Sequence, residues 1–115
     1  MASTPGKLVS ASGKNETVLS ARPGVLTYLT ASNINASPRY LKLYNKASAP
    51  VVGTDTPVHT FLIPGNTAGA GSNIPIPDDG IHFSVGISLA LTTEATDVGT
   101  TGVAANELIV NYATS

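Results

Sequence analysis

A run of alternating residues constrains the fold of this chain more than any other feature. It occupies residues 77–93, where a Pro-Asp-Asp-Gly turn signal precedes the alternation. A period of two is typical of a β-strand with one apolar face. Such a face is buried against a second layer, so the chain is predicted to form a β-sandwich or barrel. The large apolar residues are Ile81, Phe83, Val85, Ile87, Leu89 and Leu91, and the small or polar ones are His82, Ser84, Gly86, Ser88, Ala90 and Thr92.

Shorter segments of strand-like composition follow one another along the rest of the chain. They are separated by loops rich in Gly, Pro, Asn and Ser, which form turns. No segment has the periodicity of a capped helix, and only a short turn is expected at 103–106. The spacing of turn signals favours an all-β, antiparallel sandwich of about seven or eight strands. The expected strands are 16–21, 25–31, 39–45, 58–64, 81–93 and 107–113, with 74–77 as a proline-rich edge segment and 65–73 as a long flexible loop.

The chain length indicates a single domain. Its 115 residues suffice for one core, and residues 16–115 are expected to form one β-sandwich domain. Residues 1–15 are small and polar and are expected to form a flexible N-terminal arm. Two interpretations of the arm stay open: a frayed terminus, or a segment that becomes ordered only on a neighbouring subunit.

Charged residues are unusually scarce. They make up 11% of the chain, whereas roughly 25% is usual in soluble domains. The surface therefore consists largely of small neutral residues, which repel neighbouring molecules weakly. This composition favours a component of a larger assembly, and a charge-poor soluble β-domain is the alternative.

The composition also argues against several classes of function. A net charge of −1 supplies no basic footprint for nucleic acid. The absence of cysteine excludes disulfides and Cys-ligated zinc. No apolar run approaches the ~20 residues of a membrane helix, so no membrane partner is expected. The N-terminus lacks the apolar core of a signal peptide, so export by a cleaved leader is not expected.

No metal site is expected from the sequence. Neither His59 nor His82 has a second ligand at metal-binding spacing. Asp78 and Asp79 lie together in a turn, but an EF-hand needs alternating oxygen ligands and a closing Glu. These residues are therefore interpreted as ordinary strand and turn residues.

Catalytic signatures are missing as well. No serine lies in a Gly-x-Ser-x-Gly elbow, and the glycines at 65, 69 and 71 are not followed by the Lys of a phosphate loop. Nothing in the sequence brings two carboxylates to one cleft, as a glycosidase needs. The chain is therefore predicted not to be an enzyme and to need no cofactor. The scattered carboxylates are Asp55, Glu94, Asp97 and Glu107.

Two strands carry candidate contact residues. In the strand at 39–45, Leu41 and Leu43 are predicted to face the core, while the other side is amphipathic. Tyrosine offers a large rigid contact area with a polar tip, so this side is a candidate contact surface; an ordinary solvated strand is the alternative. The strand at 25–31 is partly apolar on both sides, which is typical of a strand covered on both faces or of an interface. The candidate protein-contact residues are Tyr28, Tyr40, Lys42 and Tyr44.

Two stretches of the sequence resemble a known group of proteins. The first, at 40–65, has the pattern strand, x-Pro-x-x-Gly-x-Asp-x-Pro, strand. The second, at 79–112, begins with Asp-Gly-Ile-x-Phe-x-x-Gly-Ile and ends with Val-Ala-Ala-Asn-Glu-Leu-Ile-Val-Asn-Tyr. Together they resemble small β-sandwich structural proteins from the virion gene clusters of tailed bacteriophages and prophages. The resemblance covers residues 25–112.

Within that group, the resemblance implies a capsid decoration, or cementing, protein with a jelly-roll-like fold. Such a protein is made in the host cytoplasm and sits on the virion as a homodimer or homotrimer. It binds the major capsid protein and bridges its subunits without an active site. One alternative is another virion component of the tail, neck or spike. A carbohydrate- or receptor-binding sandwich is the other, although no Trp, four Tyr and two Phe leave few platforms for sugar stacking.

Overall fold

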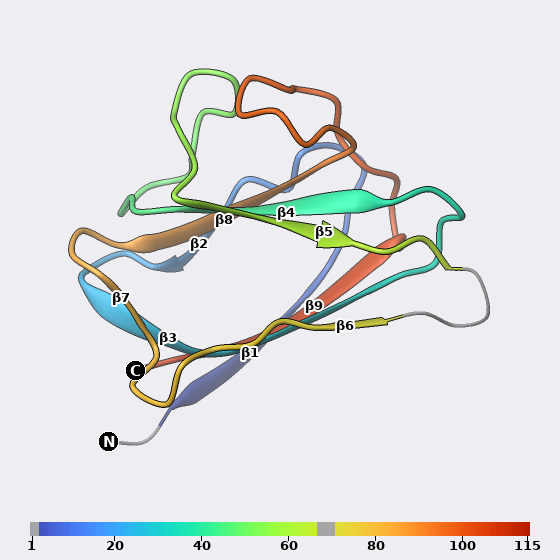
Figure 1. Cartoon of the computed structure of the whole chain (residues 1–115). Helices are drawn as coiled ribbons and strands as arrows, with labels where there is room; N and C mark the ends of the chain where they lie inside the picture. The colour runs from blue at the N-terminus through green and yellow to red at the C-terminus, as the bar shows by residue number, and fades with distance from the viewer. Residues whose placement is uncertain (1–2, 67–70) are drawn as a thin grey trace.

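The computed structural model describes residues 3–66 and 71–115, and this part of the chain consists of strands, turns and loops. Two antiparallel sheets lie face to face (Figure 1), which confirms the predicted all-β sandwich. Each sheet buries one face against the other, as the alternating patterns require. The strands are β1 (Thr4–Val9), β2 (Thr17–Ser20), β3 (Gly24–Asn33), β4 (Arg39–Tyr44), β5 (His59–Ile63), β6 (Gly71–Asn73), β7 (Ile81–Phe83), β8 (Ile87–Thr92) and β9 (Leu108–Thr114).

The strand order is that of a jelly roll. The first sheet has the order β1-β9-β3-β6, with β7 pairing the other end of β3, and the second has the order β2-β8-β4-β5. Because β6 and β7 both pair with β3, they act as one interrupted strand. Counted in this way, two sheets of four strands have the chain orders 1-8-3-6 and 2-7-4-5, the double Greek key of a jelly roll.

The core lies between the two sheets and is built mainly of leucine and isoleucine. Removing one such side chain from water contributes about 2 kcal/mol, so this layer supplies much of the driving force for folding. The alternating apolar residues at 87, 89 and 91 all belong to it, as the sequence predicts. Its fully buried members are Leu26, Leu41, Leu43, Ile63, Ile87, Leu89, Leu91, Leu108 and Val110.

The strand expected over residues 81–93 is two strands in different sheets. β7 pairs with β3 in the first sheet, whereas β8 pairs with β2 and β4 in the second. The chain crosses between the sheets at residues 84–86, where Val85 is half exposed. A Cβ at Gly86 would lie 2.5 Å from the Ala47 Cα, so glycine permits the crossing to pass close to another segment. The period of two continues through this bend, which is why the pattern alone does not reveal it.

The first strand lies where the sequence analysis expected a flexible arm. Residues Thr4–Val9 form β1, which pairs along its whole length with β9, from Thr4 opposite Thr114 to Val9 opposite Ile109. The expectation of an arm is wrong for these residues, because the backbone bonds to β9 order a segment of poor strand propensity. Gly6 permits the pairing, since a Cβ there would lie 2.3 Å from the Tyr112 ring.

The loop expected at 65–73 falls partly outside the described residues, since 67–70 are not described. Its last three residues form β6, which pairs with residues 30–32 of β3. The expected edge segment at 74–77 is not a strand. It nevertheless stays attached to β3, because the Ile74 amide donates to the Leu29 carbonyl at 3.2 Å and Ile74 is buried.

Two loops lie over the outer side of the second sheet. Residues 45–58 connect β4 to β5, and residues 93–107 connect β8 to β9; both rise above that sheet in Figure 1. Every residue of β8 is buried as a consequence, including Ser88, Ala90 and Thr92 on its polar side. The second sheet is therefore covered on both faces along β8, whereas the outer side of the first sheet lies open.

Candidate interaction surface

Lys42 is not on a contact surface, contrary to the sequence-based expectation. Its side chain is fully buried under the loop that follows β8, and Nζ donates to the Thr96 carbonyl at 2.6 Å. Burial lowers the pKa of Lys42, although the nearby carboxylates of Glu94 and Asp97 act in the opposite direction. Lys42 therefore holds a loop in place rather than offering a charge to a partner.

Tyr44 is also buried, so the expectation of a contact role is wrong for this residue too. It packs with Val52 and Ala90 in a small apolar cluster between the second sheet and the loop at 45–58. Burial raises the pKa of the Tyr44 phenol, and the carboxylates of Asp55 and Glu16 add to the increase. Its hydroxyl has no hydrogen-bond partner among the described residues.

Two carboxylates fasten this loop over Tyr44. Glu16 accepts a hydrogen bond from the Val52 amide at 3.0 Å. Asp55 accepts one from the Val51 amide at 2.7 Å and pairs with Lys46 at 2.5 Å. These hydrogen bonds, first the one from Lys46, lower the pKa of Asp55. Glu16 thus ties the loop to the segment before β2 and Asp55 closes the loop on itself, which keeps the face beneath it covered.

The remaining two candidate contact residues lie on different sheets. Tyr40 is half buried in β4, while Tyr28 lies in β3 of the opposite sheet with half of its surface exposed. The four candidates therefore do not form one surface. Tyr28 is the one of the four that lies on an open, extended face of a sheet.

The open outer side of the first sheet forms a regular surface, here called the β1–β9–β3 face. Its side chains stand in three rows, because the registers of β1 with β9 and of β9 with β3 are both fixed by pairing. The rows are Pro5–Ala113–Tyr28, Lys7–Asn111–Thr30 and Val9–Ile109–Ser32.

The chemistry of this face is apolar and hydrogen-bonding rather than ionic. Val9, Tyr28 and Ile109 are 41%, 50% and 37% exposed, and Lys7 is the one charged residue in the three rows. A shallow depression of about 510 Å³ runs over the first two rows beside Tyr28. Such a rigid, broad surface with an aromatic residue suits contact with another protein, since interface cores favour Tyr and exclude charge.

The sequence analysis does not identify Val9, because it predicts a flexible arm for residues 1–15. A signal was present: Pro5, Lys7 and Val9 alternate with Gly6 and Leu8, which is the period of a strand. Ile109 was identifiable, since Leu108, Val110 and Tyr112 of the same strand share the opposite side.

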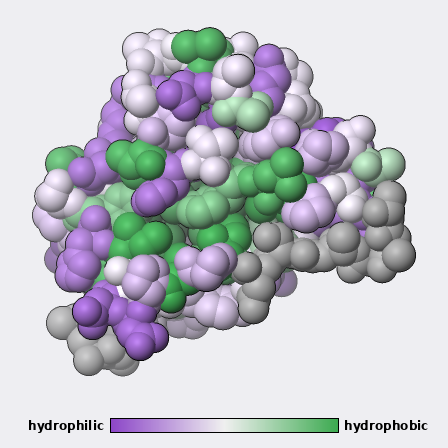
Figure 2. Space-filling model, in the orientation of Figure 1, coloured by the Kyte–Doolittle hydropathy of each residue, from purple (hydrophilic) through white to green (hydrophobic). Residues whose placement is uncertain are grey.

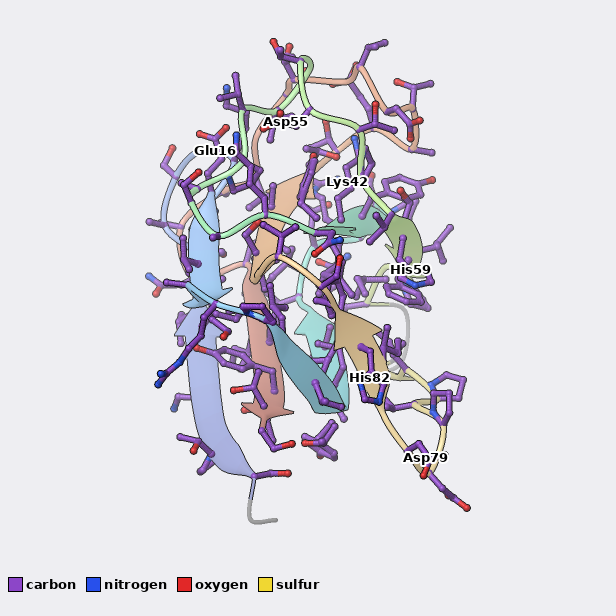
Figure 3. The ribbon with its side chains drawn as sticks, turned by 90° about the vertical axis from the view of Figure 1, so that its left-hand side faces the viewer. Glu16, Lys42, Asp55, His59, Asp79 and His82 are labelled. Atoms are coloured by element: carbon purple, nitrogen blue, oxygen red, sulfur yellow. The ribbon has the colours of Figure 1, made fainter. Side chains whose placement is uncertain are left out.

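The histidines and carboxylates do not converge on a common site. His59 stacks on Phe61 in β5 with ring centroids 5.7 Å apart, and His82 lies in β7 of the other sheet. Glu16 and Asp55 lie at one end of the molecule in Figure 3, and Asp79 lies at the other. Within residues 3–66 and 71–115, no three His, Cys, Asp or Glu residues gather closely enough to hold a metal ion.

Comparisons with other proteins give no match. Neither a protein-family model, nor a curated protein, nor a solved structure matches the chain. The described part of the chain also contains no helix that is long and apolar enough to span a membrane.

Proposed function

We propose that this chain is a bacteriophage capsid decoration protein, which binds the outer surface of the assembled shell and stabilises it by bridging subunits of the major capsid protein. The observation that carries the proposal is the β1–β9–β3 face, an open, almost uncharged sheet surface on a rigid jelly roll. The resemblance of residues 25–112 to virion β-sandwich proteins supports it.

The physical features of this face suit attachment to a shell. Three paired strands hold its side chains in fixed positions, so little conformational entropy is lost on binding. Tyr28, Val9 and Ile109 supply apolar contact, while Asn111 and Thr30 supply hydrogen-bonding groups. The face carries too little charge for long-range attraction, so its specificity arises from shape and apolar contact.

The proposed mechanism requires no chemistry beyond binding. A protein that binds only the assembled shell shifts the assembly equilibrium towards that shell by mass action. Each copy touches more than one capsid subunit, so separation of those subunits breaks the contact. Many symmetric copies then add their small contributions over the whole shell.

The proposal is tested with empty shells assembled from the major capsid protein of the same genome. Shells are mixed with the purified chain and sedimented, and the bound copies are counted. Tyr28→Ala is expected to weaken binding by roughly 30-fold, because truncating a central aromatic contact costs about 2 kcal/mol. Ile109→Lys is expected to weaken it further, because it places an unpaired charge in the contact.

Val98→Lys is the matched control, because Val98 is 70% exposed on the loop after β8, away from the face. It is expected to bind like the wild type. Absence of binding to shells would overturn the proposal, and so would equal binding by all three variants. Binding to glycans but not to shells would favour a receptor-binding sandwich instead.

A further inference from the structure

Strand β5 forms one edge of the second sheet and lacks the features that protect the edges of monomeric sheets. Its five residues, His59–Ile63, include no Lys, Arg, Asp, Glu or Pro. They pair with β4 in unbroken register, so no bulge twists the edge away. An edge strand of this kind presents backbone N–H and C=O groups that suit pairing with another strand.

The other edges of the described sheets are blunted. β1 contains Pro5, which has no N–H to donate, and the exposed Lys7. β2 has only four residues and a register shift between Val18 and Ser20. On the remaining edge, β6 and β7 have three residues each and are separated by a segment with two prolines. Among the described edges, β5 is thus the exception.

Apolar side chains gather beside this edge. Leu62 and Val58 are 53% and 51% exposed, and Phe61 is half buried. Figure 2 shows the molecule in the orientation of Figure 1, with one sheet above the other. Hydrophobic residues collect there between β5 and the segment that leads from β6 to β7. Ile76 of that segment and Ile81 at the start of β7 are partly buried and pack against the core. The free edge and an apolar surface therefore coincide.

We propose that β5 pairs antiparallel with β5 of a second copy of this chain across a two-fold axis, which joins two four-stranded sheets into one continuous sheet of eight strands. An axis at Phe61 pairs all five residues. It places Thr60 opposite Leu62 of the second copy, and His59 opposite its Ile63. Thr60, Phe61 and Ile63 have β-branched or aromatic side chains, which pack well on a pleated surface.

A second copy is the occupant that the edge itself favours. Two identical strands in antiparallel orientation match every free donor with an acceptor. The strand contains no Lys, Arg, Asp or Glu, so two copies meet without repulsion between such charges. A two-fold contact also pairs the β5 edges of both copies at once, so neither β5 edge is left open to further growth. This pairing goes beyond the proposed function and is measured without shells.

The mass of the chain in solution tests the pairing. Sedimentation equilibrium of the full chain is expected to give twice the 11.6 kDa chain mass at high concentration, with dissociation on dilution. Leu62→Glu is expected to weaken the dimer at least tenfold, because it places two negative charges in the joined sheet. Val98→Glu, which adds the same charge at an exposed loop position, is expected to leave the dimer unchanged.

A compensating variant tests the register. Thr60→Lys alone is also expected to weaken the dimer, whereas Thr60→Lys combined with Leu62→Glu is expected to restore it, since opposite charges then face each other twice across the axis. Circular dichroism is used to check that each variant is folded. If Leu62→Glu does not fold, the dissociation of the Thr60→Lys variant is measured in its place. A wild-type chain that stays monomeric or forms a trimer would overturn the proposal. So would a dimer that none of the β5 variants weakens.

Discussion

Arg39 and Glu107 join the two sheets through a doubly bonded ion pair at one end of the sandwich. Arg39 Nε donates to Glu107 Oε2 at 2.8 Å, and Nη2 donates to Oε1 at 3.3 Å. Asn35 donates to the same carboxylate at 2.7 Å. Only 14% and 5% of the two side chains are exposed, so the pair is a largely buried polar link between β4 and the chain entering β9.

Replacing Glu107 by Gln is expected to destabilise the fold. The substitution keeps the size of the side chain but leaves Arg39 without its counter-charge in a mostly buried setting. Removing one partner of a buried ion pair costs about 3 kcal/mol. Urea denaturation of the variant measures the loss. Asp79→Asn, which makes the same change in an exposed turn, is the control and is expected to stay within about 0.5 kcal/mol of the wild type.

The same carboxylate makes stability depend on pH. Burial acts to raise the pKa of Glu107, but hydrogen bonds from Arg39, Ala104 and Asn35 outweigh it, so the pKa of the folded protein lies below the ordinary 4.5. A lowered pKa means that the stabilisation is present above pH 4.5 and lost as the pH falls through the folded value. The difference in unfolding free energy between wild type and Glu107→Gln should therefore shrink below pH 4.5. A difference that stays constant down to pH 2 would contradict this assignment.

Ser10 fastens the end of β1 to the start of β9. Its buried hydroxyl accepts hydrogen bonds from the amides of Glu107 and Leu108, both at 3.0 Å, and donates to the Ala104 carbonyl at 2.8 Å. Ser10→Ala leaves these backbone groups without that partner and is expected to cost about 2 kcal/mol in thermal or urea unfolding. Ser12→Ala, at an exposed position, is expected to have little effect. Equal stability of the two variants would show that the hydroxyl contributes nothing.

Tyr44 contributes through its ring and not through its hydroxyl. Since the hydroxyl is buried without a hydrogen-bond partner among the described residues, Tyr44→Phe is expected to be neutral or to stabilise the protein by about 1 kcal/mol. Tyr44→Ala removes the packing against Val52 and is expected to cost about 3 kcal/mol or more. Chemical denaturation measures both, and a loss above about 1.5 kcal/mol for the Phe variant would contradict the proposed division.

The crossing between β7 and β8 depends on Gly86. A Cβ at this position would approach the Lys46 carbonyl oxygen to 2.7 Å, as well as the Ala47 backbone. Gly86→Ala is therefore expected to cost about 2 kcal/mol through overpacking and to loosen the loop at 45–58. Hydrogen exchange at the Lys46 amide, which donates to the Gly86 carbonyl, reports on that loop. Val85→Ala, at the half-exposed neighbour, is expected to leave this exchange unchanged.

The two-layer fold can be predicted because apolar and polar residues alternate within single strands, and this pattern is visible in the sequence without knowledge of which strands pair. The sequence also predicts the inward sides of β4 and β9 through Leu41 and Leu43 and through Leu108 and Val110. Alternation says which side of a strand is apolar, but not what lies over the other side. The burial of Lys42 and Tyr44 under two loops therefore could not be read from the pattern.

Long-range pairing explains the other differences between expectation and structure. The ordering of β1 comes from β9, whose paired residues lie 100 to 110 positions later in the chain, and no local signal specifies that partner. The division of residues 81–93 into two strands follows from a crossing that keeps the period of two intact. The β1–β9–β3 face could be anticipated only in part for the same reason, since its rows combine three separate segments.

Cryo-electron microscopy of shells saturated with the chain tests the central claim most directly. The proposal predicts regular density over the whole shell at equivalent symmetry positions, with the β1–β9–β3 face of each sandwich against the capsid surface and Tyr28 inside the contact. Density at a single vertex would assign the chain to the tail or neck instead. Shells that remain bare, or sandwiches attached with this face towards solvent, would contradict the account.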